Sequence, residues 1–311
     1  MSRDFYPYDP QDLRDAAPRA PHRHREPEPS ENRTGRGSGD TPHPDLQEPE
    51  AREPSVLKPE REDSPRAYYV RNLEYLLRES EVHTLSELGR FRVVAPSDLA
   101  KYAYAGDSAR MERDIRRLKQ QSLLTEKTLE ISGKKTLRVI TLTKQGAKLL
   151  RKTNRLPDEQ EIYHGLVKPR EAKHDADLYR LYQKEASRVE RAGGKSLRVI
   201  LDYELKRDLY RDLVALGPLK DDPDAKGLIA EKHHLQAVNG KIPLPDLRIE
   251  YENAQGELSR VDLELATRHY RPRGLAAKAR AGFSLYSHPE EASRLRRILH
   301  DQDLTAGIFA L

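Results

Sequence analysis

Three carboxylates in the last third of the sequence have the types and spacing of a divalent-metal site. Asp246 lies on one strand-like run, and Asp262 and Glu264 lie two residues apart on the next. A short turn joins the runs, so Asp246 is expected roughly opposite Leu263 and within one residue of both acids. Carboxylate oxygens suit Mg²⁺, which activates water and stabilises a phosphoryl transition state. The pattern therefore predicts a magnesium site formed by Asp246, Asp262 and Glu264.

The same hairpin also allows a purely structural interpretation. Arg248 and Glu250 lie on the same side of the first run as Asp246. From there Arg248 would pair with Asp262 or Glu264 and form a polar sheet face held by cross-strand ion pairs. Both interpretations remain open from the sequence.

A second group of candidate residues is cationic and lies on one amphipathic segment, Ser108–Leu123. Met111, Ile115 and Leu118 recur at helical spacing and form one apolar stripe. Asp107 or Ser108 can cap the first turn of this helix. The other faces carry arginines, so the helix is expected to pack on one side and to present dense positive charge on the other.

The charge of the chain is unevenly distributed. The 311 residues have a net charge of +5, but residues 65–155 hold 20 Lys and Arg against 10 Asp and Glu, a net of +10. A basic region beside a mildly acidic remainder indicates a polyanionic partner, and nucleic acid is the first candidate. The absence of cysteine excludes disulfides and thiolate metal sites and fits a cytoplasmic protein. No apolar run approaches the roughly 18 residues that span a bilayer, so no membrane association is expected.

The sequence predicts an α+β protein with a tail and two domains. Residues 1–64 hold 11 of the 21 prolines and almost no aliphatic clusters, which predicts a disordered tail. The first domain, 65–156, is expected to contain helices near 68–77, 84–91 and 97–104, the basic helix, strands 125–131 and 136–142, and a helix at 143–152. A linker follows Leu156. The second domain, 163–311, is expected to contain helices at 174–191, 205–216, 227–235, 274–287 and 289–300, with strands at 197–203, 242–251 and 258–267.

A short helix, a tight turn, a basic helix and a hairpin follow each other in the order of a winged helix-turn-helix, which residues 65–155 resemble. This resemblance implies that the basic helix enters the major groove of double-stranded DNA while the hairpin reaches phosphates. The expected contacts are Arg110, Arg113, Arg116 and Arg117 on the helix and Lys134 and Lys135 at the hairpin tip. The alternative is a module for dimerisation or protein contacts whose charge is only solvated.

The second domain resembles the restriction-endonuclease-like PD-(D/E)xK fold. Pro245-Asp246 matches the first part of that motif, and Asp262-Leu263-Glu264 supplies the acids of the next strand. If Asp262 is the second acid, Glu264 stands where lysine is expected. If Glu264 is the second acid, Ala266 stands there and Lys278 on the following helix would substitute. The resemblance implies a Mg²⁺-dependent deoxyribonuclease in which Glu185 is the helix acid, and an inactive nuclease-like fold or an unrelated α/β domain are the alternatives.

The combination of both domains is similar to the plasmid replication-relaxation family. The winged helix precedes His174-Asp175 at a helix start, the acid-bearing strands, and a helix with Lys278 followed by Tyr286. This resemblance covers residues 65–290 and implies a bacterial protein that binds DNA in plasmid replication or mobilisation, without establishing cleavage. The alternatives are a winged-helix transcriptional regulator whose C-terminal domain dimerises or binds a ligand, and a protein-interaction module without a DNA role. The oligomeric state, including a homodimer, stays open.

Overall fold

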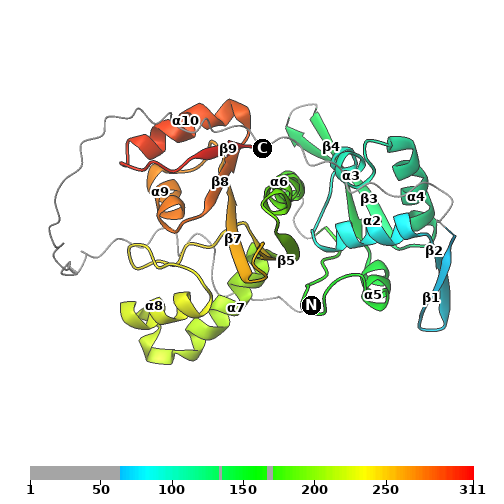
Figure 1. Ribbon diagram of the computed structural model, residues 1–311, viewed down its shortest axis with the longest axis horizontal. Coiled ribbons are helices and arrows are strands. Elements are labelled where there is room, and N and C mark those ends of the chain that lie inside the picture. The colour runs from blue at the N-terminus through cyan, green and yellow to red at the C-terminus, as the bar shows by residue number, and fades with distance from the viewer. Residues whose placement is uncertain (1–63, 133–134, 167–170) are drawn as a thin grey trace.

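The computed structural model of the protein describes residues 64–132, 135–166 and 171–311 (Figure 1). Helices and β-sheets are both present, as the predicted α+β class requires. The predicted tail up to residue 63 and the predicted contact Lys134 lie outside the described residues. None of the described helices combines the length and apolarity needed to cross a bilayer.

From residue 79 onward, the N-terminal part contains the predicted series of helices and the predicted hairpin. Pro96 begins the helix before the basic one, and Asp107 caps the basic helix by accepting a hydrogen bond from the Arg110 amide at 2.8 Å. The elements are β1 (Arg66–Val70), β2 (Leu73–Leu77), α2 (Glu79–Gly89), α3 (Pro96–Ala103), α4 (Ser108–Gln120), β3 (Leu124–Ser132), β4 (Lys135–Leu142) and α5 (Lys144–Lys152).

The helix predicted over residues 68–77 is wrong, because this segment forms the antiparallel hairpin β1–β2. Tyr68, Tyr69, Val70 and Tyr75 are aromatic or β-branched, and such residues fit a pleated strand better than a helix. Arg71 and Asn72 form the two-residue turn with φ of 49° and 64°, as tight hairpin turns require. Tyr75 is buried and Leu76 exposed, so the side chains alternate across the strand.

The C-terminal part is built around a five-stranded sheet in the order β5-β6-β7-β8-β9. The pairs β5–β6 and β6–β7 are antiparallel, whereas β7–β8 and β8–β9 are parallel. The elements are α6 (Ala172–Arg191), β5 (Lys195–Leu201), α7 (Asp202–Ala215), η3 (Gly217–Asp221), α8 (Pro223–Lys232), β6 (Leu247–Glu252), β7 (Leu258–Leu265), α9 (Pro272–Arg280), β8 (Ser284–Ser287), α10 (Pro289–His300) and β9 (Ile308–Ala310).

The helix predicted over residues 274–287 is too long. It ends at Arg280, and the chain reverses at Gly282, whose φ of 80° suits glycine, before β8 begins. The last residues form the short edge strand β9.

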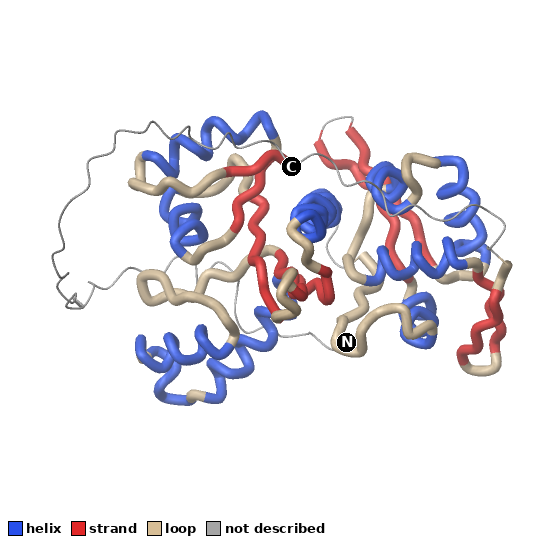
Figure 2. Tube along the Cα trace, in the orientation of Figure 1, coloured by secondary structure: helices blue, strands red, loops and turns tan. Residues whose placement is uncertain are grey.

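The sheet lies between two helical layers (Figure 2). Leu247, Leu263 and Tyr286 pack in one apolar cluster with Leu178 of α6. The opposite cluster combines residues of α7, α9 and α10 with Leu285 of β8. Both faces are therefore covered, which explains why polar residues of the central strands are buried.

The helix α6 also packs against the N-terminal part, so the two predicted domains share one apolar core. The ring of Tyr179 meets that of Phe91 edge-on at 5.2 Å between centroids, and its hydroxyl donates to Glu87 at 2.8 Å. Gln160, in the predicted linker, donates to the Val199 carbonyl and accepts from the Val199 amide, both at 2.9 Å. The connecting segment is therefore packed along β5 and does not act as a free tether.

Candidate functional site

The helix α4 has the two faces that its sequence predicts. Met111, Ile115 and Leu118 are buried in the core of the N-terminal part. Arg113 and Arg116 are exposed, three residues apart on one side of the helix. Two predicted DNA-contact residues therefore occupy the outward face.

The remaining cations of this region have mixed surroundings. Arg110 is half-buried beside the helix cap, and Lys135 is exposed at the start of β4. Arg117 is half-buried, with its guanidinium 3.3 Å from Asp114 and 3.7 Å from Glu81, so this predicted contact faces α2 rather than the outward side. Arg138 of β4 pairs with Glu112 of α4 and so ties the hairpin to the helix.

The candidate acidic site lies where β6 begins and β7 ends. The strands pair Leu247 with Leu263, so Asp246 lies across from Glu264, one residue from the predicted register. The Asp246 amide donates to the Glu264 carboxylate at 3.2 Å, and the Asp246 carboxylate accepts from the Leu265 amide at 2.8 Å. We call Asp246 and Glu264 the acid pair.

Two cationic side chains from different helices contact the acid pair. Nε2 of His174, at the start of α6, lies 3.4 Å from Oδ2 of Asp246. Nζ of Lys278, on α9, lies 2.8 Å from Oε2 of Glu264, whose other oxygen accepts from the Tyr270 hydroxyl. Glu264 is fully buried, and Lys278 is nearly so. The positive charge of these partners compensates the buried Glu264 carboxylate and the partly buried Asp246 carboxylate.

The environment separates the acidities of the two carboxylates. For Asp246, burial raises the pKa, but the charges of His174 and Lys278 outweigh burial and leave the pKa below its usual value. For Glu264, burial and the Asp246 charge raise the pKa, and Lys278 only partly opposes them. Burial lowers the pKa of His174, but Asp246 and Asp175 raise it to about 11. The site thus combines an ionised aspartate with a protonated histidine at neutral pH.

Asp262 does not join the acid pair. It lies directly across from Arg248, and the guanidinium donates to both of its oxygens, at 2.6 and 2.9 Å. Arg248 also donates to the main-chain oxygens of His233 and His234, at 2.8 and 3.0 Å. This is the cross-strand ion pair that the structural interpretation of the sequence predicted.

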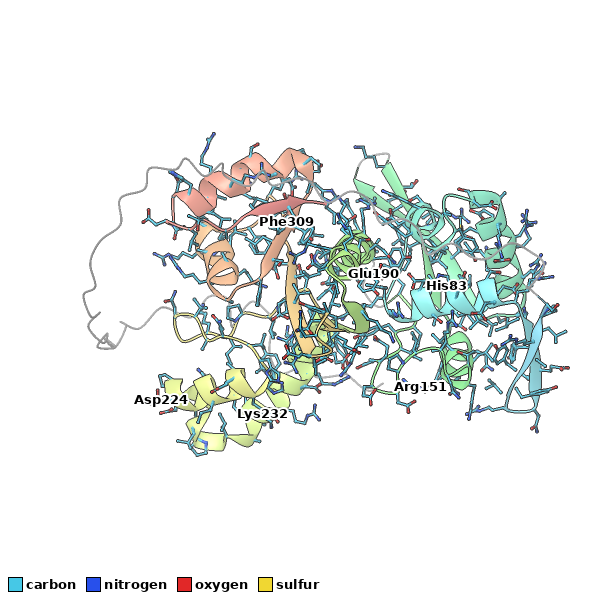
Figure 3. The ribbon with its side chains drawn as sticks, viewed as in Figure 1. His83, Arg151, Glu190, Asp224, Lys232 and Phe309 are labelled. Carbon is cyan, nitrogen blue, oxygen red and sulfur yellow. The ribbon has the colours of Figure 1, made fainter. Side chains whose placement is uncertain are left out.

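Glu185, the predicted helix acid, lies away from the acid pair. It is fully buried, accepts from the Tyr286 hydroxyl at 2.5 Å and pairs with Arg188. It follows His174 by eleven residues, which is about 16 Å along a helix. Phe309, labelled in Figure 3, covers this second cluster at 5.2 Å from the Tyr286 ring. The residue of α6 that reaches the acid pair is therefore His174.

Tyr270 and Arg92 are site residues that reasoning from the sequence missed. Arg92 comes from the N-terminal part, and its guanidinium lies 3.6 Å from Asp202 and 3.9 Å from Asp175. The Asp202 amide in turn donates to the Asp246 carbonyl at 3.0 Å. In the sequence, the adjacent His174 and Asp175 were the only signal that a charged site lies here. Arg92 precedes them by about eighty residues, so no helix or strand periodicity could connect it with Asp175.

Comparisons with known proteins return little for this chain. No family model matches it, and no curated protein matches it. Among solved structures, the chain is similar to the crystal structure of Bacillus subtilis PadR in complex with operator DNA. That similarity has 16% identity and a TM-score of 0.21, and it covers 45% of this chain and 72% of that one. At such a TM-score it supports no conclusion about fold or function.

Proposed function

We propose that the protein binds double-stranded DNA through α4 and the β3–β4 hairpin. The observation that carries this proposal is the outward face of α4, where Arg113 and Arg116 are exposed opposite the buried stripe of Met111, Ile115 and Leu118. A helix that follows another across a short turn is the element that helix-turn-helix proteins lay in the major groove. The exposed Lys135 at the start of β4 and the +10 charge of residues 65–155 further support a phosphate partner.

Replacing Arg113 and Arg116 together with alanine is expected to weaken duplex binding in a salt-dependent way. Each phosphate contact adds about one unit to the slope of log affinity against log salt, so the slope should fall by about two. Fluorescence anisotropy with a labelled duplex at several salt concentrations measures both quantities.

The matched control for this measurement is Arg297→Ala, an exposed arginine on α10, which lies on the opposite side of the molecule from α4 (Figure 1). It should leave the slope unchanged. Equal effects of the α4 and α10 substitutions would contradict a dedicated DNA surface on α4.

We also propose that the acid pair supports Mg²⁺-dependent hydrolysis of a phosphodiester. Its support is the approach of Asp246 and Glu264 from neighbouring strands, with Lys278 on the following helix in contact with Glu264. This contact supports the hypothesis that Lys278 substitutes for the lysine missing at Ala266. The helix before a sheet with antiparallel and then parallel pairs agrees with the restriction-endonuclease-like interpretation.

The acid pair fits Mg²⁺ by donor type. In residues 64–132, 135–166 and 171–311, no group of three or more Asp, Glu, His or Cys side chains is arranged to hold a metal ion. Mg²⁺ does not require such a group, because it is often held by one or two carboxylates together with waters and substrate phosphates. A bound Mg²⁺ supplies water activation and charge stabilisation. Lys278 places its ammonium group beside Glu264, and His174 holds the Asp246 carboxylate in place.

Substitution of Asp246 by asparagine is expected to abolish metal-dependent nicking of supercoiled plasmid, since one of two ligands is lost. Asp262→Asn is the matched control, because Asp262 pairs with Arg248 and should be dispensable for cleavage. Mn²⁺ binding followed by calorimetry gives a readout independent of activity, and it should be lost only in the Asp246 variant. Nicking that survives in Asp246→Asn, or that stops equally in Asp262→Asn, would exclude the acid pair as the metal site.

The biological setting that we propose is plasmid replication or mobilisation in the bacterial cytoplasm, as the replication-relaxation resemblance implies. The contact between His174 and Asp246 supports it, because both residues belong to the pattern that carries the resemblance. The alternative is a transcriptional regulator, as a monomer or homodimer, whose C-terminal part dimerises or binds a ligand. The plasmid-nicking assay distinguishes the two proposals, because a regulator retards DNA in a gel-shift experiment but does not nick it with any metal ion present.

A further inference from the structure

The longest acid-free stretch of the C-terminal part follows directly after the acid pair. Between Glu264 and Glu290 the sequence contains no Asp or Glu but has four arginines and one lysine. Lys278 is used internally against Glu264. The arginines are exposed, and Arg268, Arg271 and Arg273 fall within six residues that also include the exposed His269. We call residues 268–273 the basic segment.

The basic segment contacts the acid pair through one side chain. Tyr270, in its middle, donates its hydroxyl hydrogen to Glu264. The Tyr270 amide closes a turn onto the Thr267 carbonyl at 3.0 Å, and Arg294 of α10 donates to the Arg268 carbonyl. The segment is thus anchored by a side chain and by the main chain, and its exposed arginines lie within three residues of Tyr270, which contacts the acid pair.

This arrangement has an electrostatic consequence. Two carboxylates repel a phosphodiester, whereas guanidinium groups beside them attract it and form charge-assisted hydrogen bonds with its oxygens. A row of cations along the edge of a site raises the local concentration of an anionic polymer. The segment is also separate from the outward face of α4, because α9 and α4 lie on opposite sides of the molecule (Figure 1).

We propose that the basic segment binds the phosphodiester backbone of the DNA strand whose phosphate reaches the acid pair. Arg268, His269, Arg271 and Arg273 supply the contacts, and Tyr270 fixes the segment against Glu264. This inference deepens the proposed role of the acid pair and rests on it, but it concerns binding and does not require hydrolysis.

Amide hydrogen exchange followed by mass spectrometry on the full chain tests the proposal. The protein is measured with and without a 30-base-pair duplex, in EDTA so that no cleavage occurs. We expect slower exchange in peptides covering residues 266–275 as well as in those covering α4. Protection at α4 alone would overturn the basic segment and leave the proposed winged-helix function intact. Protection at residues 266–275 alone would support the segment and contradict the role of α4, and protection at neither would refute both.

Reciprocal double variants sharpen this test. Arg268→Gln with Arg273→Gln should remove protection at residues 266–275, keep it at α4, and lower the salt slope of duplex binding by about two. Arg113→Gln with Arg116→Gln removes the same amount of positive charge. This variant should lose protection at α4 and keep it at residues 266–275. If the Arg268 and Arg273 variant keeps the wild-type slope and protection, the basic segment does not bind DNA. Circular dichroism verifies that both variants are folded.

Discussion

Replacement of Lys278 by methionine is expected to lower the free energy of unfolding by about 3–5 kcal/mol near pH 8, because it leaves the buried Glu264 carboxylate without its charged partner. Glu264 is 0% exposed and Lys278 is 8% exposed, so water does not reach the pair freely. Methionine preserves most of the packing volume and removes only the charge and its hydrogen bonds to Glu264 and the Leu244 carbonyl. Urea unfolding followed by circular dichroism measures the effect.

The loss should shrink as the pH falls. The pKa of Glu264 is raised in the folded protein, so ionisation of this carboxyl group opposes folding. The protonated group stabilises the fold at pH values below its pKa in the unfolded chain. This stabilisation is lost as the pH rises through its pKa in the folded protein. Removing Lys278 raises that pKa further, so protonation of Glu264 at pH 5 should recover part of the stability. Glu264→Gln combined with Lys278→Met should also recover much of it. A loss below about 1 kcal/mol at pH 8, or one independent of pH, would show that Lys278 does not neutralise Glu264.

Substitution of Glu87 by alanine is expected to lower the free energy of unfolding by about 3–5 kcal/mol, because Glu87 is the common acceptor of a buried network between the N-terminal and C-terminal parts. Its carboxylate accepts from the Tyr179 hydroxyl and from the Gln183 amide, both at 2.8 Å, and pairs with Arg90 at 3.3 Å. Burial and the Glu87 charge raise the pKa of Tyr179 well above its usual value, so this hydroxyl remains a donor. Without Glu87 the Tyr179 hydroxyl and the Gln183 amide would each lose a buried acceptor.

The control for this prediction is Glu79→Ala on the same helix. Glu79 pairs with Arg155 at 2.9 Å, but both side chains are nearly half exposed, so about 1 kcal/mol or less is expected. Limited proteolysis gives a second readout, because loosening of the contact should speed cleavage near residues 156–166 only in the Glu87 variant. Equal stability of the two variants would mean that the network does not hold the parts together.

This network has a functional consequence, because α6 serves both parts. Its central residues pack against Phe91 and Glu87, and its first turn carries His174 to Asp246. Arg92 reaches Asp175 and Asp202 from the other direction. The outward face of α4 and the acid pair are therefore held in one packed body, which sets the relative positions of the two proposed DNA contacts.

The sequence by itself determined the features that depend on neighbouring residues. The apolar stripe and the Asp107 cap of α4 follow from helical periodicity and from the chemistry of one turn. The β3–β4 and β6–β7 hairpins follow from alternation and from short turns, so Asp246 and Glu264 were found as candidates. The same reasoning failed at residues 68–77, where apolar residues recur at spacings compatible with a helix and a strand, and aromatic content favoured the strand.

Only the tertiary structure decided which candidates meet. A one-residue change of register exchanges the two faces of a strand. Leu247 and Leu263 are buried on the side of the sheet that faces α6, and this burial selects the register. In that register Asp246 lies across from Glu264, and Asp262 pairs with Arg248. Periodicity could not choose between Glu185 and His174, because both belong to one helix and its axial position is set by packing with the sheet and with α2. The contacts of Lys278, Tyr270 and Arg92 likewise join segments distant in sequence, and such contacts arise only when separate apolar surfaces are buried together.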